Sequence, residues 1–132
     1  MQQRKIRILL TRSLLEGHDM GIRMIANKCR DSGFEVIYTR FSDIKEIAKS
    51  AGEEAVDIIG LTSSSGNYFY LASELLTLLK DNNMEIPVIF GGVIPTQDVP
   101  RLIEIGVKKI FGPGSTPDEA VKFVSDLLSR TS

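Results

Sequence analysis

Residues 56–63 read Val56-Asp57-Ile58-Ile59-Gly60-Leu61-Thr62-Ser63, and only Asp57 and Gly60 interrupt the apolar part of this run. A strand with one face in water would alternate apolar and polar residues. A nearly continuous apolar run instead predicts a strand that is covered on both faces, as in a parallel sheet. The later segment 86–90 contains the apolar run Val88-Ile89-Phe90 and supports the same interpretation.

Outward from this strand, short β-rich runs alternate five times with amphipathic helical patterns along the 132 residues. The predicted strands cover residues 5–12, 34–39, 56–63, 86–90 and 108–111. The predicted helices lie between residues 22 and 33 and over residues 43–54, 67–82, 95–105 and 116–129. Five such units with short connections predict a single α/β domain over residues 1–132. Its core would be a flavodoxin-like or Rossmann-like doubly wound sheet of five parallel strands, in three α/β/α layers.

Apolar residues at helical spacing predict the buried faces of the first and last helices. The first helix carries Ile22, Ile25, Ala26 and Cys29, and Gly33 ends it. The last helix is expected to bury Ala120, Phe123, Val124 and Leu127. Its start, Ser115-Thr116-Pro117, supplies a capping hydroxyl and a first-turn proline. Cys29 is therefore predicted to be a core residue and not a reactive thiol.

The composition excludes several classes of partner. Sixteen basic and seventeen acidic side chains give a formal net charge of −1, so we expect neither nucleic acid nor an anionic membrane as a partner. A single cysteine excludes an internal disulfide framework. No run approaches the roughly 18–20 apolar residues of a membrane span. Because residues 1–5 lead straight into the first strand, a signal peptide is not expected and the predicted location is cytoplasmic.

Glycine and hydroxyl-bearing residues follow several of the predicted strands. They lie in the segments 13–21, 62–67, 91–95 and 112–116, and the first of these contains the only histidine, His18. In a doubly wound sheet, ligands bind beyond the carboxyl ends of the strands. Each segment alone also fits ordinary turns. Together they predict a broad groove in which the backbone comes close to a flat or bulky ligand.

His18 is a candidate metal ligand, although a single histidine on a loop also fits a solvated surface residue. Glu16 could hold one ring nitrogen and leave the other for a metal. The sequence contains no P-loop, no Gly-x-Gly-x-x-Gly after the first strand and no Gly-x-Ser-x-Gly elbow. A phospho-accepting receiver would need an aspartate where Thr62-Ser63 stands. We therefore expect no catalytic residue in this chain.

Four motifs in register resemble the cobalamin-binding domain of adenosylcobalamin-dependent mutases, especially the methylmalonyl-CoA mutase group. The first is Glu16-Gly17-His18-Asp19-Met20-Gly21, which is similar to the Asp-x-His-x-x-Gly of that family. Thr62-Ser63-Ser64 occupies the position of the family's Ser-x-Leu. Gly91-Gly92 matches the family's Gly-Gly, and the residues that follow it as far as Asp98 also resemble acyl-CoA mutase sequences. Phe111-Gly112-Pro113-Gly114 is the fourth. The resemblance runs from about Lys5 to Leu128.

The resemblance implies a function and a set of site residues. The chain would be the cobalamin-binding small subunit of an acyl-CoA mutase and inactive alone. Its partner would be a large TIM-barrel subunit that binds the acyl-CoA. His18 would replace the cofactor's own base as the lower axial ligand of cobalt. The nucleotide tail would enter a slot lined by Thr62, Ser64, Gly91 and Gly92. The full set of implied cofactor-binding residues is Arg12, Glu16, Gly17, His18, Asp19, Gly21, Thr62, Ser63, Ser64, Gly91, Gly92, Val93, Gly112, Gly114, Ser115 and Thr116.

The chain departs from the family pattern on the cofactor side. At four positions this chain has a different residue from the family. It has Glu16 where the family has aspartate, Arg12 where lysine is usual, Leu14 where glycine is usual, and Ser64 in place of the leucine of Ser-x-Leu. Two alternatives stay open. One is a corrinoid carrier for methyl transfer, although such carriers usually have a helical domain before this fold and the first strand here is predicted from Lys5. The other is a flavodoxin-like interaction module that binds no corrinoid.

Overall fold

The sheet consists of five strands over the residues that the computed structural model describes, which are 5–13, 20–62, 67–112 and 114–129. These strands are β1 (Arg7–Ser13), β2 (Glu35–Phe41), β3 (Ile58–Thr62), β4 (Val88–Gly91) and β5 (Lys109–Phe111). They lie in the order β2-β1-β3-β4-β5, and every pair of neighbours is parallel. The chain reverses direction across the sheet between β1 and β3, which makes their carboxyl ends the switch point. The predicted flavodoxin-like sheet is confirmed.

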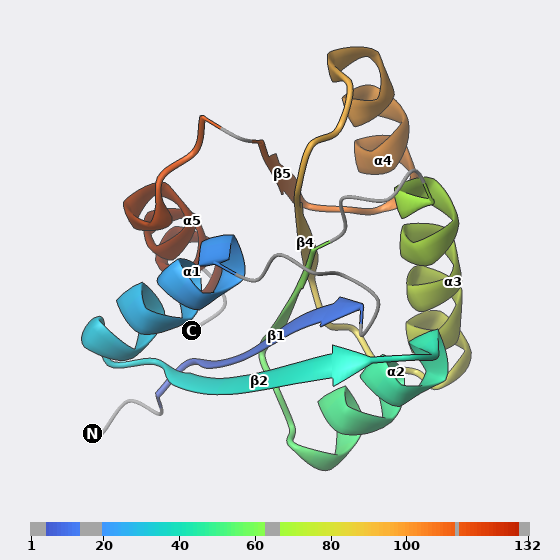
Figure 1. Ribbon diagram of the computed structural model, residues 1–132. Coiled ribbons are helices and arrows are strands. Elements are labelled where there is room, and N and C mark those ends of the chain that lie inside the picture. The colour runs from blue at the N-terminus through green and yellow to red at the C-terminus, as the bar shows by residue number, and fades with distance from the viewer. Residues whose placement is uncertain (1–4, 14–19, 63–66, 113, 130–132) are drawn as a thin grey trace.

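Helices cover both faces of this sheet (Figure 1). One layer consists of α1 (Met20–Asp31) and α5 (Pro117–Ser129). The other contains α2 (Ile44–Glu53), α3 (Tyr68–Asp81) and α4 (Val99–Ile105), with a short 3-10 helix, η1 (Thr96–Asp98), before α4. The three-layer prediction is therefore confirmed. No helix within the described ranges is long and apolar enough to cross a membrane.

Strand β3 is buried on both faces, as its apolar run predicts. Ile58 packs into the cluster under α1 and α5, whereas Ile59 and Leu61 pack into the cluster under α2, α3 and α4. All three are fully buried. Each such side chain contributes about 1.5–3 kcal/mol of hydrophobic stabilisation. The strand thus joins the two halves of the core.

Gly60 interrupts the apolar run of β3 for a packing reason. It is the register partner of Leu10 on β1, and a Cβ atom built on Gly60 would lie 2.7 Å from Leu10 Cδ2. This distance is far shorter than a carbon–carbon contact of about 3.5–4.0 Å. The glycine therefore makes room for the leucine side chain.

A side-chain cap marks the start of α2, and a glycine follows the end of α1. At the start of α2, Asp43 accepts a hydrogen bond from the Lys45 N–H, and Glu46 accepts one from the Asp43 N–H. The N–H groups of Asp43 and Ser42 both donate to Glu46, and these bonds lower the pKa of the Glu46 carboxyl. Gly33, after α1, has a φ of +91°, a region that favours glycine. The predicted stop at Gly33 is confirmed.

Three expectations from the sequence need correction. The predicted helix 95–105 begins only at Val99, because Pro95 is extended and residues 96–98 form a 3-10 turn. Phe123 and Leu127 are only partly buried, since they lie at the flank of the stripe formed by Ala120 and Val124. Strand ends also differ by one to two residues at most positions. These ends are set by pairing with neighbouring strands, which a local pattern does not contain.

Candidate functional site

Several predicted site residues share one row at the carboxyl edge of the sheet. Arg12 on β1 is the register partner of Thr62 on β3, and Thr62 is the partner of Gly91 on β4. Gly91 in turn pairs with Phe111, which directly precedes Gly112. Residues that are up to 100 positions apart in the sequence are thereby brought side by side at the switch point.

Arg12 is a buried cation at the end of β1, with an exposed fraction of 6%. Its Nε donates a hydrogen bond of 2.9 Å to the hydroxyl of Tyr38, and its Nη1 lies 3.5 Å from the Ser13 carbonyl oxygen. A buried charge needs such partners because it has lost water. Tyr38 is not among the predicted site residues. Tyr38 lies two residues from Arg40, the register partner of Arg12, so period-two alternation places it on the same face.

No close packing contact within the described residues requires a glycine at position 91. A Cβ atom built there would lie 3.5 Å from Thr62 Cγ2 and 3.7 Å from the Phe111 carbonyl oxygen, which are ordinary contacts. Gly112 and Gly114 would meet nothing within 4 Å. Unlike Gly60, these glycines are not required by packing within the described chain. The space beside Gly112 and Gly114 would let a bulky ligand approach the backbone there.

Gly92 and Val93 continue the wall beyond Gly91. Gly92 has a φ of +141°, which favours glycine, and its N–H donates to the Phe111 carbonyl oxygen at 3.2 Å. This bond ties the segment after β4 to the end of β5. Val93 is 67% exposed, an unusual fraction for a large apolar side chain next to a core strand. Val93 therefore presents an apolar surface at the same edge.

The segment after β5 leads into α5 through a hydrogen-bonded turn. The Ser115 N–H donates to the Gly112 carbonyl oxygen at 3.0 Å. The Thr116 Oγ1 accepts a bond of 3.2 Å from the Glu119 N–H, which confirms the predicted capping hydroxyl. Because this oxygen already accepts a bond, Thr116 would face a ligand chiefly as an O–H donor.

The remaining predicted residues divide into two groups. Gly21 lies in the first turn of α1, and a Cβ atom there would meet nothing within 4 Å. The other six lie outside the described residues; they are Glu16, Gly17, His18, Asp19, Ser63 and Ser64. In the sequence, these six residues fall between β1 and α1 or between β3 and α3.

Four side chains beyond the predicted set connect the segments that follow β3 and β4. The Tyr68 hydroxyl, at the start of α3, donates a hydrogen bond to Oδ2 of Asp98 in η1. This bond raises the pKa of the Tyr68 hydroxyl. Next to it, the Arg101 guanidinium carbon lies 4.3 Å from the centroid of the Phe69 ring. No local sequence pattern marks these pairs, because both are contacts between separate helices.

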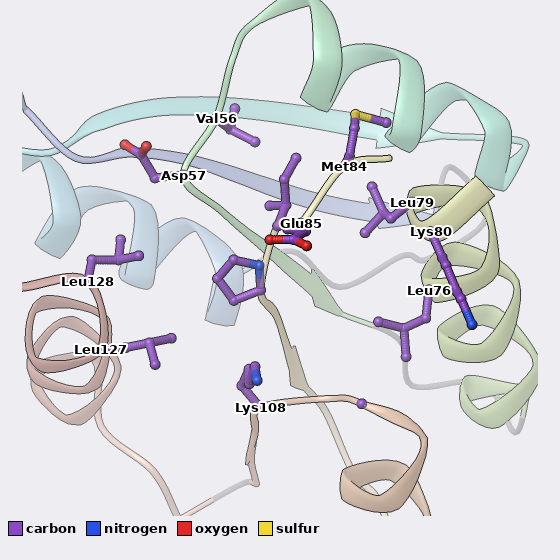
Figure 2. Close-up of a pocket in the computed structure, with 13 residues that line it drawn as sticks. Val56, Asp57, Leu76, Leu79, Lys80, Met84, Glu85, Lys108, Leu127 and Leu128 are labelled. Carbon is purple, nitrogen blue, oxygen red and sulfur yellow. The ribbon is translucent and has the colours of Figure 1, made fainter. Parts of the chain in front are cut away.

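A pocket of about 650 Å³ opens at the opposite edge of the sheet. Figure 2 shows Leu127 and Leu128 of α5 on one side of it and Leu76 and Leu79 of α3 on another. Its other lining residues are Val56, Asp57, Lys80, Met84, Glu85, Ile86, Pro87, Gly106 and Lys108. These residues lie near the amino ends of β3, β4 and β5. None of the predicted cofactor residues lines this pocket.

The sequence matches a known family over most of its length. Residues 6–122 match the B12 binding domain. The small subunit of pivalyl-CoA mutase from Xanthobacter autotrophicus is 36% identical over 129 residues, which are 97% of this chain and 87% of that protein. The small subunit of 2-hydroxyisobutanoyl-CoA mutase from Aquincola tertiaricarbonis is 30% identical, over 98% of this chain and 96% of its own length.

Longer mutases and a solved structure are similar as well. Methylmalonyl-CoA mutase of Cereibacter sphaeroides is 39% identical over 127 residues, which are 95% of this chain but only 18% of the enzyme. A cobalamin-binding protein from Desulfitobacterium hafniense has the same fold, with a TM-score of 0.78 at 22% identity, over 93% of this chain and 59% of that one. The expected resemblance is confirmed by these matches. This chain belongs to the B12-binding domain family, and its relatives include the small subunits of two coenzyme A mutases.

Proposed function

We propose that this chain is the cobalamin-binding small subunit of an adenosylcobalamin-dependent acyl-CoA mutase, with residues 1–132 acting as one cofactor-binding unit. The observation that carries the proposal is the row Arg12, Thr62, Gly91 at the switch point, where the last strand residue of β4 carries no side chain. The near full-length match to two mutase small subunits supports the separate-subunit form.

The open backbone suits the nucleotide tail of the cofactor. Thr62, Gly91 and Gly92 would line the slot together with Ser63 and Ser64. Because Gly91 lacks a side chain, a flat base can lie against its peptide groups. The Thr62 hydroxyl can donate to or accept from a buried base nitrogen that has lost its water. Gly114, Ser115 and Thr116 would close the slot beside α5, with Gly112, Val93 and Gly21 around its mouth.

The loop after β1 would supply the cobalt ligand. His18 is the only histidine of the chain, and we assign its imidazole to the lower axial position. Glu16 would accept a hydrogen bond from the other ring nitrogen and fix the orientation of the ring. Gly17 and Asp19, which are adjacent to His18 in the sequence, would contact the cofactor beside it. Arg12, held by Tyr38, lies at the strand end from which the loop departs.

The chain's part in the reaction is to bind and orient the cofactor. When bound, adenosylcobalamin would supply the radical chemistry of the reaction. The acyl-CoA would bind in a large TIM-barrel subunit that covers the upper face of the corrin. This chain contributes no catalytic residue in the proposed reaction, and alone it is expected to be inactive and to bind cobalamin weakly, since half the cofactor would face solvent.

A spectral titration tests this proposal. The full chain is titrated with hydroxocobalamin, and the absorbance change that reports displacement of the cofactor's own base is measured. The wild-type chain and Met24→Ala, a control at an exposed α1 position (51% exposed), are expected to give this change. His18→Ala is expected to lose it. A His18→Ala chain with the wild-type spectrum contradicts the ligand assignment. No change in any chain, even with the large subunit present, favours an interaction module that binds no corrinoid.

A further inference from the structure

Arg12, Thr62 and Gly91 lie on the face of the sheet that α1 and α5 cover (Figure 1). Side chains alternate between the two faces along a strand, so residues two or four positions apart share a face. The residues that precede these three at such positions are Leu10, Ile58 and Ile89, and all belong to the core cluster under α1 and α5. One side of the carboxyl edge therefore carries a cation, a hydroxyl group and a residue without a side chain.

The opposite face of this edge is closed by packing. Leu61 and Phe90 are buried there in the core cluster under α2, α3 and α4. Thr11 is also fully buried, and its hydroxyl oxygen accepts a hydrogen bond of 2.9 Å from the Thr39 hydroxyl. A polar ligand at this edge would therefore find its charged partner on the α1 and α5 side, in Arg12.

Tyr38 fixes the direction of the Arg12 side chain. The Arg12 Nε donates a hydrogen bond of 2.9 Å to the Tyr38 hydroxyl. A guanidinium is planar and holds its N–H groups in a rigid fork, so a bond at Nε sets the direction in which Nη1 and Nη2 point. Tyr38 is held in turn, because it packs against the core cluster under α1 and α5. Since Arg12 is buried, this direction is set before a ligand arrives.

The chemistry of the partner matters as well. A carboxylate in the place of the Tyr38 hydroxyl would neutralise the guanidinium, whereas a phenol accepts the hydrogen bond without doing so. Hydrogen bonds from a charged donor are roughly twice as strong as those between neutral groups. An arginine that is oriented by a neutral partner is suited to bind an acceptor oxygen.

We propose that Tyr38 is a positioning residue, which directs the Arg12 guanidinium to donate to an acceptor oxygen of the bound corrinoid. This inference rests on the proposed function, which places Arg12 among the cofactor-binding residues. Cobalamin offers such oxygens in two places, the amide side chains of the corrin ring and the phosphodiester of the nucleotide tail.

Absorbance titrations with two corrinoids test the role of Tyr38. Hydroxocobalamin has both kinds of oxygen, and aquocobinamide has the corrin amides without the phosphodiester. Tyr38→Phe in the full chain should weaken hydroxocobalamin binding about fivefold, or about 1 kcal/mol, the scale of one hydrogen bond. Tyr70→Phe removes the same hydroxyl group from an exposed tyrosine of α3 and is the matched control, with wild-type affinity expected.

A double-mutant cycle shows whether Tyr38 acts through Arg12. Arg12→Met removes the guanidinium and keeps an unbranched side chain. In the Arg12→Met background, Tyr38→Phe should change the affinity by less than about twofold, because the group that it positions is gone. A loss that is undiminished in that background would show a general structural effect of Tyr38 and would overturn the inference.

Arg12→Lys supplies the comparison if Tyr38→Phe fails to fold. Lysine keeps the charge but has no fork to orient. The inference predicts that Arg12→Lys loses nearly as much affinity as Arg12→Met. Wild-type affinity in Arg12→Lys would contradict it.

The two corrinoids identify the acceptor and separate this inference from the proposed function. A loss for hydroxocobalamin alone assigns the acceptor to the phosphodiester, and equal losses for both corrinoids assign it to a corrin amide. Wild-type affinity for both corrinoids in Tyr38→Phe overturns the inference and leaves the proposed function standing. A wild-type chain that binds neither corrinoid contradicts the proposed function, and the inference with it.

Discussion

Two glycines of the central strands should respond in opposite ways to the same substitution. Gly60→Ala places a Cβ atom 2.7 Å from Leu10 Cδ2 in the core, and β1 and β4 hold β3 on both sides. Overpacking of this kind costs about 1–3 kcal/mol of unfolding free energy. Gly91→Ala places its Cβ atom at 3.5 Å from Thr62 Cγ2, an ordinary contact. Its unfolding free energy should stay within about 1 kcal/mol of the wild-type value.

The effects on cofactor binding should be reversed. If the nucleotide tail lies against the Gly91 backbone, the added methyl group occupies space that the tail needs. An intrusion that costs about 1–3 kcal/mol weakens binding about 5- to 150-fold. Gly60 lies in the core, away from the carboxyl edge of the sheet. Folded Gly60→Ala protein should therefore bind hydroxocobalamin with nearly the wild-type affinity.

Urea unfolding and hydroxocobalamin titration of both variants check this pair. The expected result is a stable Gly91→Ala chain that binds poorly and a destabilised Gly60→Ala chain that binds well. Wild-type affinity in Gly91→Ala would refute the placement of the tail against this backbone. A loss of stability in Gly91→Ala as large as in Gly60→Ala would refute the packing argument.

Two further predictions concern groups away from the slot. Burial raises the pKa of the Cys29 thiol to about 11, and the side chain is 1% exposed, so at pH 8 about one thousandth of it would be thiolate. Ellman's reagent should modify the folded chain slowly and the urea-unfolded chain quickly; equal rates would contradict the buried assignment. The pKa of Glu46 is lowered in the folded state, so its contribution to stability is present above its unfolded pKa and is lost as the pH falls through the folded value. Glu46→Gln should lower the urea midpoint at pH 7 and much less at pH 3; the same difference at both pH values would contradict this.

Much of the fold was predictable because its signals are local or periodic. The apolar run in β3 predicted burial on both faces, and Gly33 follows α1 with a positive φ, as its position predicts. The late start of α4 was missed. Pro100 lies in the first turn of α4, where proline is tolerated. A proline in this place fits a helix that begins at residue 95 as well as one that begins at Val99, so the sequence does not reveal the 3-10 turn over residues 96–98.

The site divides in a similar way. The row of Arg12, Thr62 and Gly91 follows from strand ends, which the alternating pattern places at one edge. The hydrogen bonds of Tyr38 and Tyr68 depend on strand register and on helix packing, so the local sequence does not predict them. The roles of Glu16 and His18 stay predictions from resemblance, as both residues lie outside the described ranges.

The single histidine allows a direct measurement of the cobalt ligand. The chain is produced with ¹⁵N-labelled histidine, which labels His18 alone, and is combined with unlabelled cob(II)alamin for electron paramagnetic resonance. An axial ¹⁵N nucleus, of spin one half, splits each cobalt line into two, whereas the ¹⁴N of the cofactor's own base, of spin one, splits it into three. We predict doublets from His18. Triplets in the bound state would show that the cofactor keeps its own base, and they would contradict the assignment of His18 as the cobalt ligand.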